Sequence, residues 1–170
     1  KINMKNRDIN IRIEDYILNC RAVAIIINND NILFQKRKQD EFWALPGGKI
    51  RVGETTKETI IRELEEELGL NNFNVSDVTT VSEYFFNFGE DKYHQFIFGH
   101  KVLVKDDEWI LNNNEFDGIE EQENLVFKWF KLEELGTAPI KPDFLKYQLE
   151  NINKKEFQFV TYKEEKQMII

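Results

Sequence analysis

Residues 48–70 read GKIRVGETTKETIIRELEEELGL, and this stretch specifies a helix more strongly than any other part of the sequence. Thr55 is followed three places later by Glu58, a capping box that satisfies free backbone N–H groups at a helix start. Gly69 readily takes the left-handed conformation that ends a helix. The sequence therefore predicts a helix from about Thr56 to Leu68, with both ends encoded locally.

The predicted helix has an apolar face and an acidic face. Apolar side chains recur at three- and four-residue spacing, and we expect them to pack on a sheet: Ile60, Ile61, Leu64 and Leu68. Beside them, Glu63, Glu66 and Glu67 fall on adjacent turns, where like charges repel. A hard cation such as Mg²⁺ relieves that repulsion, because it takes oxygen ligands. Alone, this acidic pattern is more typical of a solvated helix face.

Alternating and β-branched runs on both sides of this helix indicate a sheet. The expected strands are 21–27 and 32–34, joined by a turn at 28–31, then 78–88 and 93–104 as a second hairpin, then 125–130 and 156–162. Residues 132–135 are expected to begin a short helix. Pro142 suits the first turn of another helix, which carries Phe144, Leu145 and Leu149.

Composition limits the class of protein. The chain has 170 residues and 41% hydrophobic residues, which fits a single domain spanning 1–170. The net charge of −8 argues against binding to long nucleic acid. One cysteine, Cys20, and no leader or apolar membrane span are visible, so we expect a cytoplasmic protein without membrane contact. Cys20 is expected to be a packed thiol. Lys1–Asn3 precede Met4 and are interpreted as additions to the native chain.

The spacing of the glycine, glutamate and arginine residues in 48–70 shows a resemblance to a known family. Gly48, Glu54, Arg62-Glu63-Leu64, Glu66-Glu67 and Gly69-Leu70 match the Nudix box, G-x5-E-x7-R-E-U-x-E-E-x-G-U with U aliphatic, without a departure. In a sequence of ordinary composition, the probability of such a match by chance is of the order of 10⁻⁹ at each start position. The resemblance implies an α/β/α sandwich with a mixed central sheet, in which the box forms a loop-helix-loop.

The same resemblance implies roles for individual residues. Glu63, Glu66 and Glu67 would bind Mg²⁺ or Mn²⁺, with a carbonyl of Gly47 or Gly48 as a further ligand. Glu54 would pair with Arg62 or support the metal ligands. Members of the family differ in the general base, so here it is either Glu63 or a carboxylate of the downstream acidic loop: Glu120, Glu121 or Glu123. Among these loop residues we take Glu121 as the candidate catalytic residue.

Substrate-binding residues are less evident in the sequence. Arg37 ends the second strand, where it would reach phosphate oxygens or lie solvated, and the sequence favours neither. Phe85 is taken as the candidate for stacking a base, although aromatic residues in a Phe-rich core are more often packing. His94 and His100 share one predicted strand but lie too far apart for one metal, so both are interpreted as structural.

The resemblance implies an enzyme that hydrolyses a pyrophosphate bond in a nucleoside diphosphate derivative. The compact chain slightly favours a nucleoside triphosphate or a similar small nucleotide. ADP-ribose, nucleotide sugars and dinucleoside polyphosphates remain alternatives, as does a catalytically silent nucleotide-binding module. Removal of an RNA cap would need a basic groove, which the acidic composition disfavours. A homodimer is left open.

Overall fold

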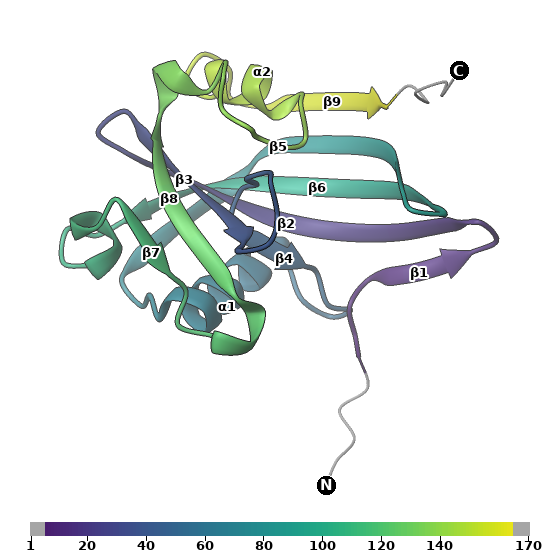
Figure 1. Ribbon diagram of the computed structural model, residues 1–170, viewed down its shortest axis with the longest axis horizontal. Helices are drawn as coiled ribbons and strands as arrows, with labels where there is room; N and C mark the ends of the chain where they lie inside the picture. Colours follow the sequence, from purple (N-terminus) through teal and green to yellow (C-terminus); the bar gives the residue numbers. More distant parts are fainter. Residues whose placement is uncertain (1–5, 165–170) are drawn as a thin grey trace, which may run out of the picture.

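The computed structural model describes residues 6–164 as a mixed β-sheet with a helix on each face (Figure 1). Seven of the nine strands follow the order β7-β8-β3-β2-β6-β5-β9, and the other two, β1 and β4, pair with β2. The strands are β1 (Asn10–Ile13), β2 (Tyr16–Asn28), β3 (Asn31–Arg37), β4 (Gly47–Lys49), β5 (Phe73–Phe88), β6 (Asp91–Val104), β7 (Glu115–Asp117), β8 (Leu125–Lys131) and β9 (Gln158–Lys163). The helices are α1 (Thr56–Leu68) and α2 (Leu145–Glu150), and 3-10 turns occupy Trp109–Asn112, Glu121–Glu123 and Leu132–Glu134.

The central strand β2 is buried on both faces, which explains its continuous apolar sequence. Ala22, Ala24 and Ile26 pack in the cluster that contains the apolar side chains of α1. Val23 and Ile25 point to the opposite face and pack in the cluster that contains Leu145 and Leu149 of α2. The expected α/β/α layering is therefore observed, with β2 contributing alternate side chains to the two cores.

Strands β2 and β3 form a tight hairpin and then diverge. Asn29 and Asp30 have φ angles of 46° and 62°, the left-handed conformation that Asn and Asp tolerate in a two-residue turn. Ladder pairing is confined to the tip of the hairpin. Beyond it, the segment 44–46 enters the gap: Ala24 N donates to Pro46 O at 2.8 Å, and Gln35 N donates to Ala44 O at 2.8 Å. This opening places the following strand β4 beside β2.

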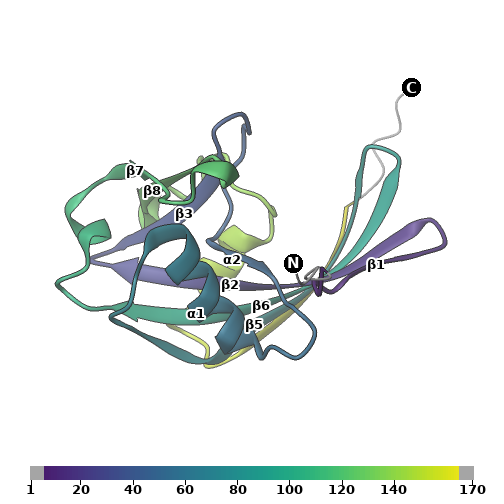
Figure 2. The same ribbon diagram turned by 90° about the horizontal axis from the view of Figure 1, so that it is seen from below.

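Two hairpins extend the sheet away from the helices. In Figure 2 the β1–β2 and β5–β6 hairpins project to the right of the part of the molecule that contains α1 and α2. Strand β6 is parallel to β2, and β9 is parallel to β5, whereas the remaining pairs are antiparallel. The expected mixed sheet is thus confirmed.

Most predicted elements are confirmed, with differences in extent and facing. Helix α1 has the predicted bounds, Thr55 and Glu58 form both bonds of the capping box, and Gly69 is left-handed with φ 63°. Ile61 was predicted to be buried, but it is 46% exposed, because the sheet covers a narrower arc of the helix than the sequence pattern suggested. The predicted place of Pro142 in a helical turn is wrong, since α2 begins only at Leu145.

Other features concern the chain ends and the single cysteine. Cys20 is partly buried against the α1 core cluster, where burial raises the pKa of its thiol. Within residues 6–164, no helix is long and apolar enough to cross a bilayer. Lys1–Asn3 lie outside the described residues.

Candidate active site

Two glycines allow strand β4 to approach both β2 and helix α1. A Cβ atom on Gly47, which has φ 151°, would lie 2.1 Å from the carbonyl oxygen of Ala22. A Cβ atom on Gly48 would lie 2.1 Å from Oε1 of Glu63. Neither position has room for a side chain, so the backbone of β4 lies directly against a carboxylate of α1. This is the arrangement expected of a site in which a backbone carbonyl and a carboxylate share a ligand.

The acidic face of α1 contains a buried carboxylate that lacks a hydrogen-bond partner. Glu67 is 6% exposed, and its Oε2 accepts no hydrogen bond from any described residue. Burial, followed by the charge of Glu63, raises the pKa of the Glu67 carboxyl well above its usual value. A buried carboxylate without a partner is costly unless a cation or a proton compensates it. The site therefore has the charge and the free oxygen that a hard divalent cation requires.

Arg62 holds this carboxylate face in place. Its Nε donates to Glu54 Oε1 at 2.6 Å and its Nη2 to Glu54 Oε2 at 3.1 Å, a bidentate pair. Its Nη1 donates to Glu63 Oε1 at 2.7 Å and, more weakly, to Glu66 Oε2 at 3.4 Å. Its Nη2 also donates to the carbonyl of Lys49 at 3.2 Å, which ties α1 to β4. One guanidinium thus orients two carboxylates of α1 and the neighbouring backbone.

Glu54 is held as an anion by the same network. The hydrogen bond from Arg62 is the largest influence that lowers the pKa of the Glu54 carboxyl to about 2, although burial opposes it. Glu54 Oε2 also accepts from Thr59 Oγ1 at 2.9 Å and from Arg51 N at 3.2 Å. Both carboxylate oxygens of Glu54 thus accept hydrogen bonds from the preceding loop and from α1. Glu54 therefore positions the elements that carry the cluster and does not itself point at a free ligand.

The downstream acidic loop closes over the cluster. The N–H of Ile119 donates to the carbonyl of Glu67 at 2.8 Å, so the loop is anchored on the last turn of α1. Glu120 and Glu123 line the same cavity as the α1 carboxylates, whereas Glu121 does not. Burial, followed by the charges of Glu123, Glu66 and Glu63, raises the pKa of the Glu120 carboxyl. The structure therefore separates Glu121 from the other predicted catalytic residues and brings Glu120 and Glu123 to the site.

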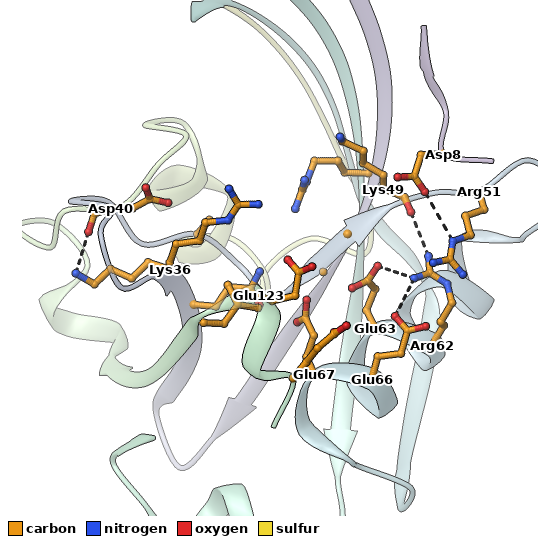
Figure 3. Close-up of a pocket in the computed structure, with 18 of the residues that line it drawn as sticks. Asp8, Lys36, Asp40, Lys49, Arg51, Arg62, Glu63, Glu66, Glu67 and Glu123 are labelled. Atoms are coloured by element: carbon orange, nitrogen blue, oxygen red, sulfur yellow. Dashed lines mark hydrogen bonds and ion pairs between the residues drawn. The ribbon is translucent and has the colours of Figure 1, made fainter. Parts of the chain in front are cut away.

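Two adjoining cavities meet beside the carboxylates. The first, about 460 Å³, contains the acidic cluster on one side and basic side chains around it (Figure 3). In Figure 3, Glu63, Glu67 and Glu123 point toward a common space, with Lys36 on one side of it and Arg51 on the other. The second cavity, about 930 Å³, is lined by aromatic residues of β5 and by Phe144, the residue before α2. Arg21, Arg37, Asp40, Phe42 and Ala44 line both cavities.

The predicted substrate-binding residues are divided by the structure. Arg37 lies at the junction of the two cavities. Phe85 lines neither cavity; it stacks on His94 with ring centroids 4.2 Å apart. Its neighbours Tyr84 and Phe86 face the second cavity instead. Adjacent residues of a strand point to opposite faces, so an aromatic site is present one position away from the predicted one.

One residue of the site, Arg21, was missed in the sequence, whereas His100 was interpreted as structural. Arg21 precedes the apolar run of β2 and lies at the cavity junction; a charged residue entering a buried strand was the available signal. His100 is 1% exposed and links two elements: Nδ1 lies 2.8 Å from Ser76 O, and Nε2 lies 2.8 Å from Thr56 Oγ1. A neutral imidazole satisfies both contacts by donating to the carbonyl and accepting from the hydroxyl. His100 thereby fixes the start of α1 against the sheet.

No three His, Cys, Asp or Glu side chains within residues 6–164 are already arranged as a complete metal-binding group. Glu66 is the most exposed of the three α1 carboxylates and is turned toward Arg62. The fit to a cation rests on the orphan oxygen of Glu67 and on the Gly48 backbone pressed against Glu63. These two features supply oxygen ligands at one place, which is what Mg²⁺ or Mn²⁺ would need.

The fold and the site define an α/β sandwich protein with a glycine loop and a glutamate-bearing helix at its functional centre. The sequence profile of the NUDIX domain matches residues 18–151. The chain therefore belongs to the Nudix family.

Comparisons with individual proteins agree with this assignment. The chain is 44% identical over 71 residues to an ADP-ribose pyrophosphatase of Methanocaldococcus jannaschii, covering 39% of this chain and 41% of that protein. It is 44% identical over 54 residues to the 8-oxo-dGTP diphosphatase of Escherichia coli, covering 29% and 42%. These matches span less than half the length of the two relatives.

A solved structure supports the fold over a longer span. The crystal structure of a mutator MutT protein from Bacillus halodurans matches with a TM-score of 0.62 at 18% identity, covering 87% of this chain and 91% of that one. At this identity the similarity concerns the fold alone.

Proposed function

We propose that this protein hydrolyses a pyrophosphate bond in a nucleoside diphosphate derivative, with Mg²⁺ or Mn²⁺ as its cofactor. The observation that carries the proposal is the buried, unpartnered carboxylate oxygen of Glu67 beside Glu63 and the Gly48 backbone. That arrangement lies in a cavity that is also lined by basic side chains, among them Lys36, Arg37 and Arg51, so it suits a cation together with phosphate groups. The names of the two relatives, a pyrophosphatase and a diphosphatase, support the reaction class.

The proposed metal ligands are Glu63, Glu66, Glu67 and the carbonyl of Gly48. When bound, the metal would activate water and neutralise charge on the leaving phosphate. Arg62 and Glu54 act as positioning residues, because their ion pair holds Glu63 and the β4 backbone at fixed places. Removal of such supporting partners typically weakens metal binding or activity 10- to 100-fold.

A carboxylate of the 118–124 loop is proposed to accept the proton of the attacking water. Glu120 is the better candidate, because it lines the site and its carboxyl has a raised pKa, which makes the carboxylate a stronger base. Glu123 also lines the cavity and is the second candidate. Glu121, the candidate chosen from the sequence, does not line the cavity, so it is not proposed as the base.

The nucleoside is proposed to occupy the second cavity. Tyr84, Phe86 and Phe144 provide aromatic surface there, and buried polar side chains lie beside them. Among these, Gln148 Nε2 donates to Ser82 Oγ at 2.9 Å. Aromatic walls with a few fixed polar groups suit a base and a ribose. A nucleoside triphosphate or a similar small nucleotide remains the preferred substrate, with ADP-ribose, nucleotide sugars and dinucleoside polyphosphates as alternatives.

A panel assay tests the reaction class. Release of phosphate, pyrophosphate and nucleotide products is measured with nucleoside triphosphates, ADP-ribose, nucleotide sugars and dinucleoside polyphosphates. Each is tested in Mg²⁺, in Mn²⁺ and in chelator. The proposal predicts turnover that needs the metal and favours one class. A folded protein that binds nucleotides but turns over none of the panel would instead be the catalytically silent module.

A further inference from the structure

Two arginines lie at the junction of the two cavities. Arg21 lies on β2 and Arg37 ends β3, at the place where these strands have been separated by the segment 44–46. Both line the cavity that contains the carboxylates and the cavity that contains the aromatic residues. Any ligand that extends from one cavity into the other must pass them.

Neither guanidinium is paired within the part of the chain that the structure describes. No hydrogen bond or ion pair of residues 6–164 involves the side chain of Arg21 or Arg37, although both lie close enough to influence each other. Burial lowers the pKa of the Arg21 guanidinium, the charges of Glu63 and Glu67 oppose this, and the charge of Arg37 adds a smaller lowering. Asp40 also lines the junction but makes no ion pair with either arginine.

The two guanidiniums have donors to offer to a ligand. Arg21 is partly buried and carries five N–H donors in a fixed fork. A phosphate group matches that fork with two parallel hydrogen bonds. The charge of the two arginines at the junction thus suits a bound phosphate.

We propose that Arg21 and Arg37 grip the phosphate that is attached to the nucleoside, between the aromatic cavity and the carboxylates. The proposal rests on the proposed function and narrows it to nucleotides with a phosphate at the junction and a further one at the carboxylates. Arg21 is the new element of this clamp. Arg21 is a specificity-determining residue that favours nucleoside di- and triphosphates over nucleosides.

A structural role for Arg21 makes a different prediction. If Arg21 were an internal support, replacing it would lower the melting temperature of the ligand-free protein. Loss of such a support would also weaken nucleoside and diphosphate binding equally, whereas in the clamp Arg21→Gln weakens diphosphate binding selectively. Arg12→Gln is the matched control, because Arg12 is exposed on β1 and pairs with Asp91 away from both cavities.

Binding in chelator tests the clamp without the metal. The probes are ADP, GDP, CDP and UDP, their parent nucleosides, and inorganic pyrophosphate, measured by calorimetry with wild type, Arg21→Gln, Arg37→Gln and Arg12→Gln. The clamp predicts that both cavity variants weaken binding of the preferred diphosphate about tenfold or more, while nucleoside binding changes less than about twofold. Arg12→Gln should bind every probe as wild type does. Wild type should also bind the diphosphate more tightly than pyrophosphate, since the clamp is continuous with the nucleoside cavity.

Two results would overturn the proposal: diphosphate binding unchanged in Arg21→Gln, or equal loss of nucleoside and diphosphate binding. If Arg21→Gln does not fold, Arg21 is structural and the clamp is rejected; Arg37→Gln then measures the contribution of the second arginine alone. Turnover in Mg²⁺ and Mn²⁺ is recorded separately. Arginine-dependent binding without turnover would reject the proposed hydrolysis and keep the clamp, whereas turnover with unchanged binding would reject the clamp alone.

Discussion

Gly48 and Glu63 are so close that a Cβ on the glycine would lie 2.1 Å from Oε1 of the glutamate. Gly48→Ala must therefore displace the carboxylate or the β4 backbone. A misplacement of about 1 Å at a catalytic group can cost about 100-fold, and we expect a loss of that size in kcat/KM. Gly136→Ala is the control, because a Cβ there meets no atom within 4 Å. Steady-state kinetics and thermal unfolding of both variants distinguish displacement from unfolding; wild-type kinetics in Gly48→Ala would contradict the assignment.

Glu67→Gln is expected to abolish metal-dependent turnover while preserving the fold. The variant replaces a buried, unpartnered carboxylate by a neutral amide, so the metal-free protein should be as stable as wild type or more so. Loss of a metal ligand is expected to cost several kcal/mol in the transition state, about 1,000-fold in rate. Thermal unfolding with and without Mn²⁺ provides a second measurement: the metal should stabilise wild type and not the variant.

Glu65→Gln is the matched control for that experiment, because Glu65 is exposed on the same helix. Its turnover and its stabilisation by Mn²⁺ should equal those of wild type. A Glu67→Gln protein that retains activity would reject the metal assignment.

The loop carboxylates are separated by three substitutions. We expect Glu120→Gln to lower kcat by about 100-fold or more, the usual contribution of a general base. Glu121→Gln should stay within about twofold of wild type, because Glu121 does not line the cavity. The pH dependence of kcat in Glu120→Gln should also lose its acidic limb. Equal losses in Glu120→Gln and Glu121→Gln would place the base elsewhere.

The contribution of His100 to the stability of the protein should fall as the pH decreases below about 6.5. Burial lowers the pKa of the His100 imidazole in the folded protein, so the unfolded chain binds a proton first. The contribution of His100 is therefore fully present above pH 6.5 and is lost as the pH falls toward the folded pKa. The free energy of unfolding is measured by urea denaturation between about pH 8 and pH 5.

His100→Gln removes this titration but keeps a hydrogen-bonding side chain. Its free energy of unfolding should be lower at pH 8, by about 1–3 kcal/mol for the disturbed bonds to Thr56 and Ser76. The difference in the free energy of unfolding between wild type and His100→Gln should narrow as the pH falls below 6.5. Parallel curves for the two proteins would show that His100 does not carry the pH dependence.

The sequence predicted the parts of the molecule that local interactions determine. Helix α1 has both ends encoded within a few residues, and its bounds were predicted without error. The hairpin of β2 and β3 follows similarly from an apolar run and a turn of Asn and Asp. Ile61 was misplaced, because the width of the arc that the sheet covers is set by tertiary packing.

The details of the site depend on contacts that the sequence pattern does not contain. Phe85 and Tyr84 differ by one position on β5, and the register of β5 with β6 shifts between Val75 and Thr80, so the facing of later residues cannot be extrapolated along the strand. Which glutamate of the 118–124 loop faces the cavity depends on the anchoring of Ile119 to the Glu67 carbonyl. Arg21 became a site residue only when β2 and β3 separated around the segment 44–46.

The two cavities are built largely from different elements, and this affects how the substrate preference of the protein can change. The carboxylates belong to α1 and the glycines to β4, whereas the aromatic cavity is built mainly from β5 and the segments 39–45 and 141–148. Substitutions in β5 and in 141–148 can thus change the accepted base without moving a reacting group. Mutational drift in substrate preference should accumulate there, and the residues at the junction should tolerate the fewest changes, since they serve both cavities.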